Sequence, residues 1–315
     1  MDFNFGMMGA GLAVGTLVGL TGMGAGSLMT PILINVFGIP AGTAVGTDLV
    51  YAAITKTFGA ARHHQLKNVS KELGLWMAAG SIPAAVVGTF SLYNLFGDHI
   101  DQWLPTVVGI ALVFVGIGVA VRTFVSVRGL WDAGKLPTDG PLTRRHKIIA
   151  VSIGVVFGFI LGLTSVGSGV FFGMALVTVF PLAARRVVGT DVFHAMLVTG
   201  AAAGATILWG HPNFGYVGSI LIGSIPGILI GSHFTAKAPE RVLRGLIAVV
   251  LAASGLKTLD APLWGYGAAT AVVLLVVVIH LFQNGHIGAK KADDAKAVAP
   301  RQPQPQPQPQ RSPGF

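Results

Sequence analysis

The chain has 315 residues, of which 52% are hydrophobic and only 10% are charged, and its formal net charge is +9. Soluble domains carry roughly 25% charged residues, so this composition excludes an ordinary globular enzyme and indicates residence in a lipid bilayer. The basic residues lie in short loops and in the C-terminal tail, a pattern that membrane topology explains and nucleic-acid binding does not. Because the sequence has no cysteine, thiol chemistry, disulfides and cysteine metal sites are excluded.

Long uncharged stretches predict membrane-spanning helices. No Asp, Glu, Lys or Arg occurs from Leu73 to Gly97, from Ile148 to Ala184 or from Leu263 to Ala289. A helix needs only about 20 apolar residues to cross a ~30 Å hydrocarbon core, and a spanning segment must satisfy its own backbone hydrogen bonds. We therefore expect helices rather than barrel strands. Asp2, and no basic residue, precedes the first apolar run, so no cleaved signal peptide is expected.

The apolar pattern divides the chain into helical segments. In chain order they are expected near 7–21, 26–38, 43–62, 73–96 and 103–125, then near 147–164, 169–181, 186–209, 215–235 and 240–257, with an extra helix near 262–283. The fold class is an all-α polytopic membrane protein with about 9–11 membrane segments. Its expected parts are a first membrane repeat (1–130), a cytoplasmic connector (131–146), a second membrane repeat (147–260), an extra C-terminal helix (261–284) and a disordered Gln-Pro-rich tail (285–315).

The two membrane regions are copies of one unit. Gly19–Asp48 and Gly162–Asp191 share 13 identities in 30 ungapped positions, at an offset of 143 residues. The same offset relates Gly80–Pro83 to Gly223–Pro226. It also relates two seams of small residues that predict tight helix packing, at Gly80, Ala84 and Gly88 and at Gly223, Gly227 and Gly231. The chain is therefore internally duplicated.

The basic residues predict opposite orientations for the two repeats. By the helix count every basic cluster falls on one side of the membrane, which the positive-inside rule makes cytoplasmic, so the N-terminus is expected outside and the C-terminus inside. The loop with Arg62 and Lys71 is then cytoplasmic, whereas its counterpart near His211 is external. This holds whether the short helices that open each repeat cross the membrane or re-enter it. Inverted repeats are a frequent ground plan of secondary transporters, with the substrate site at the repeat interface.

A Gly-rich break interrupts the start of each repeat. It reads Gly-Leu-Thr-Gly-Met-Gly-Ala-Gly-Ser from Gly19 and Gly-Leu-Thr-Ser-Val-Gly-Ser-Gly-Val from Gly162. Glycines continue a helix poorly and suit an unwound stretch whose free N–H groups, at the start of the next half-helix, attract anions. The expected substrate-binding residues are Thr21, Gly22, Gly24, Gly26, Ser27, Thr164, Ser165, Gly167, Ser168 and Gly169. Close helix packing is the alternative role for these glycines.

The sequence Gly-Thr-Asp follows 27 residues after the first glycine of each break. Thr47 and Thr190 are further candidates for substrate binding. Asp48 and Asp191 are candidate coupling or site-shaping residues, because a carboxylate at membrane depth is costly and indicates function. Each could carry a proton or hold a basic residue of the opposite repeat. Helix capping or helix-to-helix bonding is an equally weighted alternative, since Thr and Asp are good N-caps.

Three more residues are expected to couple or shape the site. Tyr51 and His194 occupy matching positions one turn after the two aspartates and face the same side, and His194 can titrate near neutral pH. Lys56 can pair with the anion or with Asp48, or can snorkel to the cytoplasmic edge, the arrangement we favour. No group of residues has the spacing of metal ligands, and no catalytic motif occurs. We therefore expect no metal, no other cofactor and no enzymatic activity.

At these motifs the sequence resembles the sulfite exporter TauE/SafE family of membrane permeases, over about residues 5–260. The resemblance rests on the duplicated Gly-Leu-Thr-x-x-Gly-x-Gly break and the Gly-Thr-Asp that follows it at matched spacing in both halves. It implies export of sulfite or small organosulfonates, with other oxyanions or sulfur compounds for some relatives. The halves differ where Ser165 replaces Gly22 and where Pro181 replaces Gly38.

These observations favour a secondary transporter that exports a small sulfur-containing anion across the bacterial inner membrane, with protons as the candidate coupling ion. The alternatives are an anion channel, a permease for another small anion, a scaffold that uses its tail to recruit a partner, and an intramembrane enzyme, against which the missing catalytic residues count. The expected partners are the anion and the lipid bilayer, with no nucleic acid. The identity of the anion and coupling ion, the direction of transport and homodimer formation stay open at this point.

Overall fold

A computed structural model describes residues 4–21, 26–95, 99–124, 142–167, 169, 171–180, 182, 184–234 and 240–262. All of them belong to one compact unit, Met1–Val277. The predicted extra helix near 262–283, the Gln-Pro-rich tail and most of the connector 131–146 lie outside the described residues.

The described residues form helices and no strand. The first repeat contains α1 (Phe5–Thr21), α2 (Gly26–Asn35), α3 (Ala41–Gln65), α4 (Lys71–Phe90) with the π-helical turn η1 (Ser91–Leu95), and α5 (Ile100–Phe124). The second contains α7 (Arg144–Thr164), α8 (Phe171–Val179), α9 (Ala184–Trp209), α10 (Phe214–Phe234) and α11 (Glu240–Thr258). Each predicted segment of the two repeats is confirmed as a helix, with ends within a few residues of those expected.

The lengths of the helices divide them into spanning and short elements. Five of the described helices are long and apolar enough to cross a membrane; the candidate spans are Lys71–Leu95, Ile100–Ala120, Arg144–Thr164, Arg186–Trp209 and Phe214–Gly231. In contrast, α2 has ten residues and α8 nine. At 1.5 Å per residue each is about 15 Å long, half of the ~30 Å hydrocarbon core. The chain is therefore a multi-pass membrane protein that contains two half-length helices.

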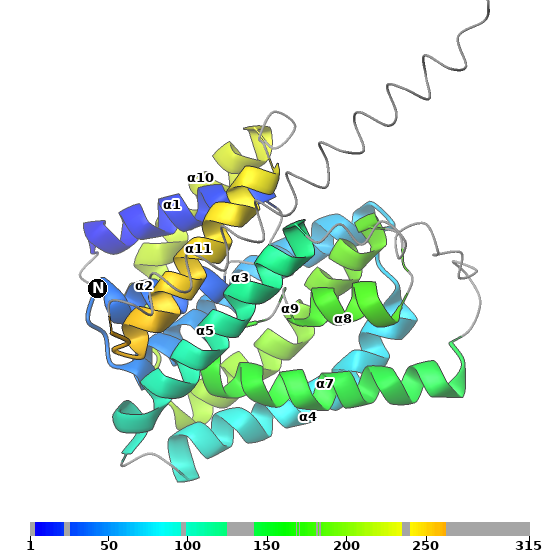
Figure 1. Ribbon diagram of the computed structural model, residues 1–315, viewed down its shortest axis with the longest axis horizontal. Helices are drawn as coiled ribbons and strands as arrows, with labels where there is room; N and C mark the ends of the chain where they lie inside the picture. The colour runs from blue at the N-terminus through cyan, green and yellow to red at the C-terminus, as the bar shows by residue number, and fades with distance from the viewer. Residues whose placement is uncertain are drawn as a thin grey trace, which may run out of the picture. The chain divides into compact units, whose positions relative to one another are not determined.

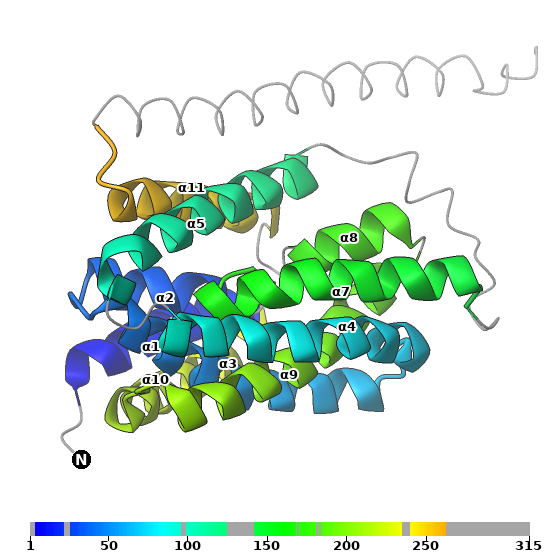
Figure 2. The same cartoon turned by 90° about the horizontal axis from the view of Figure 1, so that it is seen from below.

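Every main packing contact joins a helix of one repeat to a helix of the other. α1 packs on α10 and α4 packs on α7, while α3 packs on α9 and α5 on α11, as Figures 1 and 2 show. By the offset of 143 residues α1 corresponds to α7 and α10 to α4, so the first two contacts are equivalent. The other two each join a helix to its own counterpart. This reciprocal pattern is the one expected when two similar units pack about an approximate two-fold axis.

Small residues allow these contacts at equivalent positions. A Cβ placed at Gly223 of α10 would collide with the carbonyl oxygen of Met8 on α1. At the equivalent position in α4, a Cβ at Gly80 would collide with the carbonyl oxygen of Val151 on α7. The predicted seams of small residues are thus confirmed as close helix–helix contacts, in which the backbones approach because no side chain separates them.

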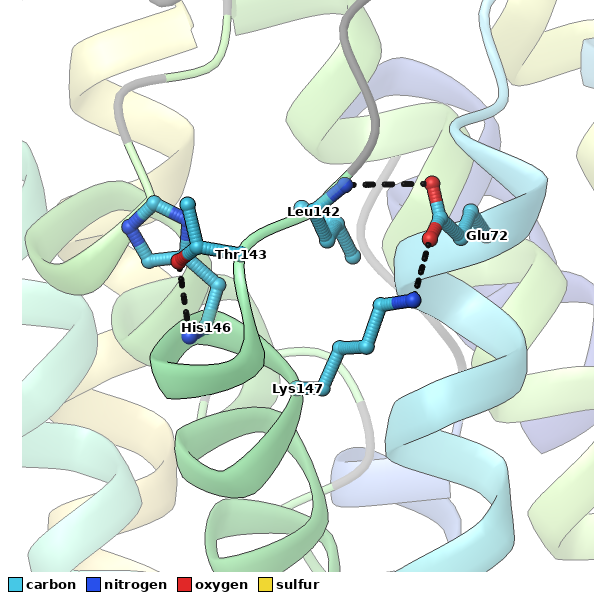
Figure 3. A network of polar contacts seen from close by, with 5 residues as sticks. All are labelled: Glu72, Leu142, Thr143, His146 and Lys147. Atoms are coloured by element: carbon cyan, nitrogen blue, oxygen red, sulfur yellow. Dashed lines mark hydrogen bonds and ion pairs between the residues drawn. The ribbon is translucent and has the colours of Figure 1, made fainter.

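A polar network joins the first turns of α4 and α7 at the protein surface (Figure 3). The Lys147 ammonium lies 3.1 Å from one carboxylate oxygen of Glu72, and the backbone N–H of Leu142 donates to the other at 3.4 Å. The Thr143 hydroxyl caps α7 by accepting from the N–H of His146 at 3.3 Å. Because the paired side chains are partly exposed, this ion pair contributes at most about 1 kcal/mol.

Candidate transport site

The buried charged side chains of the described part of the chain gather in one cluster on α3 and α9. They are Asp48 and Lys56 on α3 and Asp191 on α9, with exposed fractions of 0%, 5% and 8%. The fully buried His194 lies one turn after Asp191. The Lys56 ammonium interacts electrostatically with both carboxylates and with His194. Asp48 and Lys56 of the first repeat therefore meet Asp191 and His194 of the second repeat at the contact between α3 and α9.

The position of Lys56 corrects one expectation. Snorkelling would place its ammonium at the aqueous edge, but the side chain is buried and its charge is directed at the carboxylate groups. Lys56 follows Asp48 by eight residues, a little over two helical turns, so the two side chains share one face of α3. The preference for snorkelling was wrong because α9, with its own aspartate, covers this face.

Helix capping by the aspartates is also wrong. α3 begins at Ala41 with Pro40 as its N-cap, so Asp48 lies two turns inside the helix. Asp191 stands at the same distance from Ala184, where α9 begins. Neither carboxylate can satisfy the free N–H groups of its own helix start, because a side-chain cap acts only within the first turn.

The Asp48 carboxylate joins the two repeats through a pair of hydroxyl groups. Its Oδ2 accepts a hydrogen bond from Thr30 of α2 at 2.5 Å and another from Ser165, directly after α7, at 2.9 Å. Ser165 ends α7 in the left-handed conformation, with φ of 57°. All three residues are buried. One predicted site residue of the second break thus lies against the predicted carboxylate of the first repeat.

Tyr51 and His194 have similar surroundings in the two repeats. His194 Nε2 lies 2.7 Å from the Ser81 hydroxyl of α4, and its ring contacts that of Phe172 on α8, with centroids 4.2 Å apart. Tyr51, at the matching position, is fully buried and lies against Ser224 of α10, the counterpart of Ser81. Both side chains are therefore in the interior between the repeats, as expected from their spacing to the aspartates.

The threonines of the two Gly-Thr-Asp motifs make backbone contacts across the repeats. The Thr47 hydroxyl accepts from the N–H of Asn213, just before α10, at 3.1 Å. The Thr190 hydroxyl accepts from the N–H of Ser70, just before α4, at 2.9 Å. Each threonine thus holds the start of a helix in the opposite repeat. Their predicted role in substrate binding stays a prediction.

The second break has the unwound form that its glycines predict. After Thr164 ends α7, its hydroxyl donates to the carbonyl of Ile160 at 2.8 Å and accepts from the N–H of Val166 at 3.2 Å. Gly167 has φ of 99°, a conformation that favours glycine, and its carbonyl accepts from the N–H of Gly169 at 2.9 Å. The helix is therefore interrupted at this break, and local hydrogen bonds stabilise part of the interrupted stretch.

The first break is described only at its two ends. α1 ends at Thr21 and α2 begins at Gly26, with Ser27 as its second residue. Gly22, Gly24 and Ser168 lie outside the described residues, as do the side chains of Thr21 and Ser27. For these positions the expected contact with an anion stays a prediction.

Sequence reasoning did not identify two of the site residues, Thr30 and Ser81. Thr30 carries no signal from the duplication, because its counterpart in the second repeat is Gly173. Ser81 does recur, as Ser224, within the matched Gly-Ser-Ile-Pro. A polar residue kept in both copies of an apolar helix was a signal that could have identified it. Within the described residues no group of three or more His, Asp or Glu side chains has the arrangement of a metal site.

Several known proteins are similar to this chain. The probable membrane transporter protein YjnA of Bacillus subtilis (strain 168) is 41% identical over 252 residues, which cover 78% of this chain and 96% of that protein. The probable membrane transporter protein YdhB of the same organism is 27% identical over 249 residues, covering 77% and 95%. The probable membrane transporter protein MJ0441 of Methanocaldococcus jannaschii is 26% identical over 264 residues, covering 78% and 91%.

No solved structure matches the chain. The model of the family described as sulfite exporter TauE/SafE matches residues 7–258, nearly all of the membrane region. The earlier resemblance is confirmed over almost the whole length on which it was based. The chain is a membrane transporter and not an enzyme, and it belongs to the sulfite exporter TauE/SafE family.

Proposed function

We propose that this protein is a secondary transporter that exports a small sulfur-containing anion, sulfite or an organosulfonate, across the inner membrane. The observation that carries the proposal is the buried Lys56, which interacts electrostatically with carboxylates of both repeats in a member of this family. A buried ammonium is the group that would attract a small anion into an apolar interior. The substrate class follows from the family description.

The proposed mechanism places the anion between α3 and α9. Its negative charge would be attracted by Lys56 and by the N–H groups of the two breaks, while the reciprocal packing allows one repeat to rock against the other. An inside-negative membrane potential drives an anion outward, by about 2.3 kcal/mol per charge for each 100 mV. Protons are the proposed coupling ions, with Asp48 or Asp191 as the carrier.

The proposed orientation follows from charge. The loop between α3 and α4 contains Lys67, and α7 begins with Arg144 and Arg145, so these ends are placed in the cytoplasm by the positive-inside rule. The N-terminus is then periplasmic and the C-terminus cytoplasmic. Because the loop between α9 and α10 falls on the opposite side, the two repeats are inverted.

An anion channel is the second candidate, because the same breaks could line a continuous pore. A transporter binds its substrate in each cycle, so its flux saturates and shows countertransport, whereas a channel shows neither. The hydrogen bonds from Thr30 of α2 and from Ser165 of the second break to the Asp48 carboxylate favour the transporter, since they link the two repeats at a discrete polar site.

Flux in proteoliposomes tests the proposal. Sulfite and sulfoacetate efflux would be measured with and without a pH gradient for the wild type and for Asp48→Asn with Asp191→Asn. Saturable flux that loses its pH dependence in the double variant supports a proton-coupled exporter. Saturable flux that is indifferent to the variant excludes the carboxylates as proton carriers, and no flux above that of empty vesicles overturns the substrate class.

A further inference from the structure

The Asp48 carboxylate has one oxygen without a hydrogen bond. Oδ2 accepts from both Thr30 and Ser165. Oδ1 is just as buried, and among the described residues no donor reaches it. A buried polar atom left unsatisfied costs about 1–3 kcal/mol, and more when it is charged. Oδ1 is therefore available to a ligand that carries positive charge.

The buried charge around this oxygen is not balanced. Asp48 and Asp191 contribute two negative charges and Lys56 contributes one positive charge, so the buried Asp, Glu, Lys and Arg side chains of the described residues sum to −1. The Lys56 ammonium interacts electrostatically with both carboxylates. Uncompensated charge in a low-dielectric interior is expensive. One additional monovalent cation would bring the cluster to neutrality.

The atoms near Oδ1 suit such a cation. Carboxylate and hydroxyl oxygens are the hard ligands that small hard cations bind, and a hydroxyl that donates to a carboxylate can instead present a lone pair to a cation. Ser165 directly follows α7, whose C-terminal end carries partial negative charge. Because no further His, Asp or Glu completes a metal site among the described residues, a monovalent ion fits better than a divalent one.

On the basis of the proposed transport function, we infer that Asp48, Thr30 and Ser165 bind one monovalent cation, sodium or a proton, together with the anion. The positions that match Thr30 and Ser165 in the other repeat are Gly173 and Gly22, so this pair of hydroxyl groups does not recur. The two aspartates, though equivalent in sequence, thus have different roles.

The groups that act on Asp48 from the surrounding helices are few. Lys56 and Tyr51 interact with it electrostatically from α3 itself. From α9, Asp191 and His194 interact with the same Lys56. α2 and the residue after α7 bring only hydroxyl groups, and the described parts of α5 and α10 bring no buried charged side chain.

Cation and anion should promote each other's binding. A cation at Asp48 leaves the Lys56 charge balanced by Asp191 alone, so an arriving anion meets a neutral cluster instead of a negative one. By linkage, each ligand then raises the affinity for the other by the same factor. A doubly charged anion that leaves with one such cation still moves one negative charge outward, so the membrane potential continues to favour export.

Thermal unfolding in detergent tests the cation site without any sulfur anion. Midpoints would be compared in sodium chloride and in choline chloride at equal concentration, over a pH series, for the wild type, Thr30→Val, Ser165→Ala and Asp48→Asn. Thr57→Val is the matched control, because Thr57 is exposed on α3 and donates only to its own helix at Ala53. A sodium-dependent rise that the Thr30 and Ser165 variants lose, and the control keeps, assigns the site to sodium.

If the two salts are equivalent, the proton is the remaining cation. The pH dependence of the midpoint should then change in Asp48→Asn and persist in Asp191→Asn. Flux measurements test whether cation binding is coupled to anion export. The cation concentration that gives half-maximal sulfite efflux should rise at least about tenfold in Thr30→Val. This is the effect of losing roughly 1.4 kcal/mol of binding free energy. Variants that alter neither the sodium effect nor the pH effect overturn the inference. Failure of sulfite flux alone would overturn the substrate and leave the cation site standing.

Discussion

The hydroxyl of Ser165, at the break of the second repeat, donates to the carboxylate of Asp48, inside α3 of the first repeat, at 2.9 Å. These residues are 117 positions apart in the chain. α3 packs against α9, so each Gly-Thr-Asp motif lies close to helices of the other repeat. The hydrogen bond links the Gly-rich break, which predicts an unwound helix, to the Gly-Thr-Asp motif, which predicts a buried charge.

Removing the charge of Lys56 should destabilise the protein strongly. Lys56→Gln removes the ammonium that interacts with both buried carboxylates, and breaking a buried pair costs about 3–5 kcal/mol. Adding Asp191→Asn restores the original buried charge of −1 and should recover most of the loss. Unfolding midpoints in detergent measure both effects, with the exposed Lys67→Gln as a control expected within about 0.5 kcal/mol of the wild type. Additive losses in the double variant would show that Lys56 and Asp191 do not interact.

Alanine at the packing glycines should loosen the contact between repeats. In Gly80→Ala and Gly223→Ala the new methyl group meets a backbone carbonyl of the facing helix, so the backbones must separate. Overpacking of this kind costs about 1–3 kcal/mol. Gly218→Ala on α10 and Gly204→Ala on α9 are matched controls, since no atom lies within 4 Å of the added Cβ. Equal unfolding midpoints for the four variants would refute the assigned packing.

The two threonine contacts should be equivalent in energy. Thr47→Val and Thr190→Val each remove the acceptor for one backbone N–H, at Asn213 and at Ser70. The loss of such a bond costs about 1 kcal/mol. Similar falls in the unfolding midpoint are expected, and hydrogen exchange at the starts of α10 and α4 should rise in the respective variant. A loss at only one site would mean that the repeats are less symmetric than their hydrogen bonds indicate.

The surface ion pair should matter far less than the buried cluster. Glu72→Gln removes the partner of Lys147, but both side chains are partly exposed. Exposed pairs contribute about 0–1 kcal/mol and are screened by salt, so the unfolding midpoint should change little, and still less in high salt. A loss as large as that of Lys56→Gln would contradict this assignment.

Most of the fold was predictable because a membrane imposes simple requirements on sequence. Helices in a bilayer must be apolar and of a certain length, and duplication then fixes how their order repeats. The ends of α3 were the least accurate: a helix over 43–62 was predicted, and Ala41–Gln65 was found. Polar His63, His64 and Gln65 extend the helix beyond its apolar part.

The candidate site was predictable mainly from motifs that occur in both repeats. The aspartates were found from their recurrence and Ser165 from the Gly-rich break, yet Thr30 could not be found, because its counterpart in the other repeat is Gly173. Nor could the sequence decide between snorkelling and burial for Lys56. That choice depends on α9 packing over the face of α3, a long-range contact that no local pattern encodes.

The central claim is that two oppositely inserted repeats enclose one transport site, and cysteine labelling tests it most directly. The sequence has no cysteine, so a single introduced residue reports alone. Lys67 and His211 are exposed residues in equivalent loops, after α3 and after α9. With a membrane-impermeant maleimide on spheroplasts, His211→Cys should react at once, and Lys67→Cys only after the cells are lysed. Labelling of both variants from the same side would show parallel repeats and contradict the account.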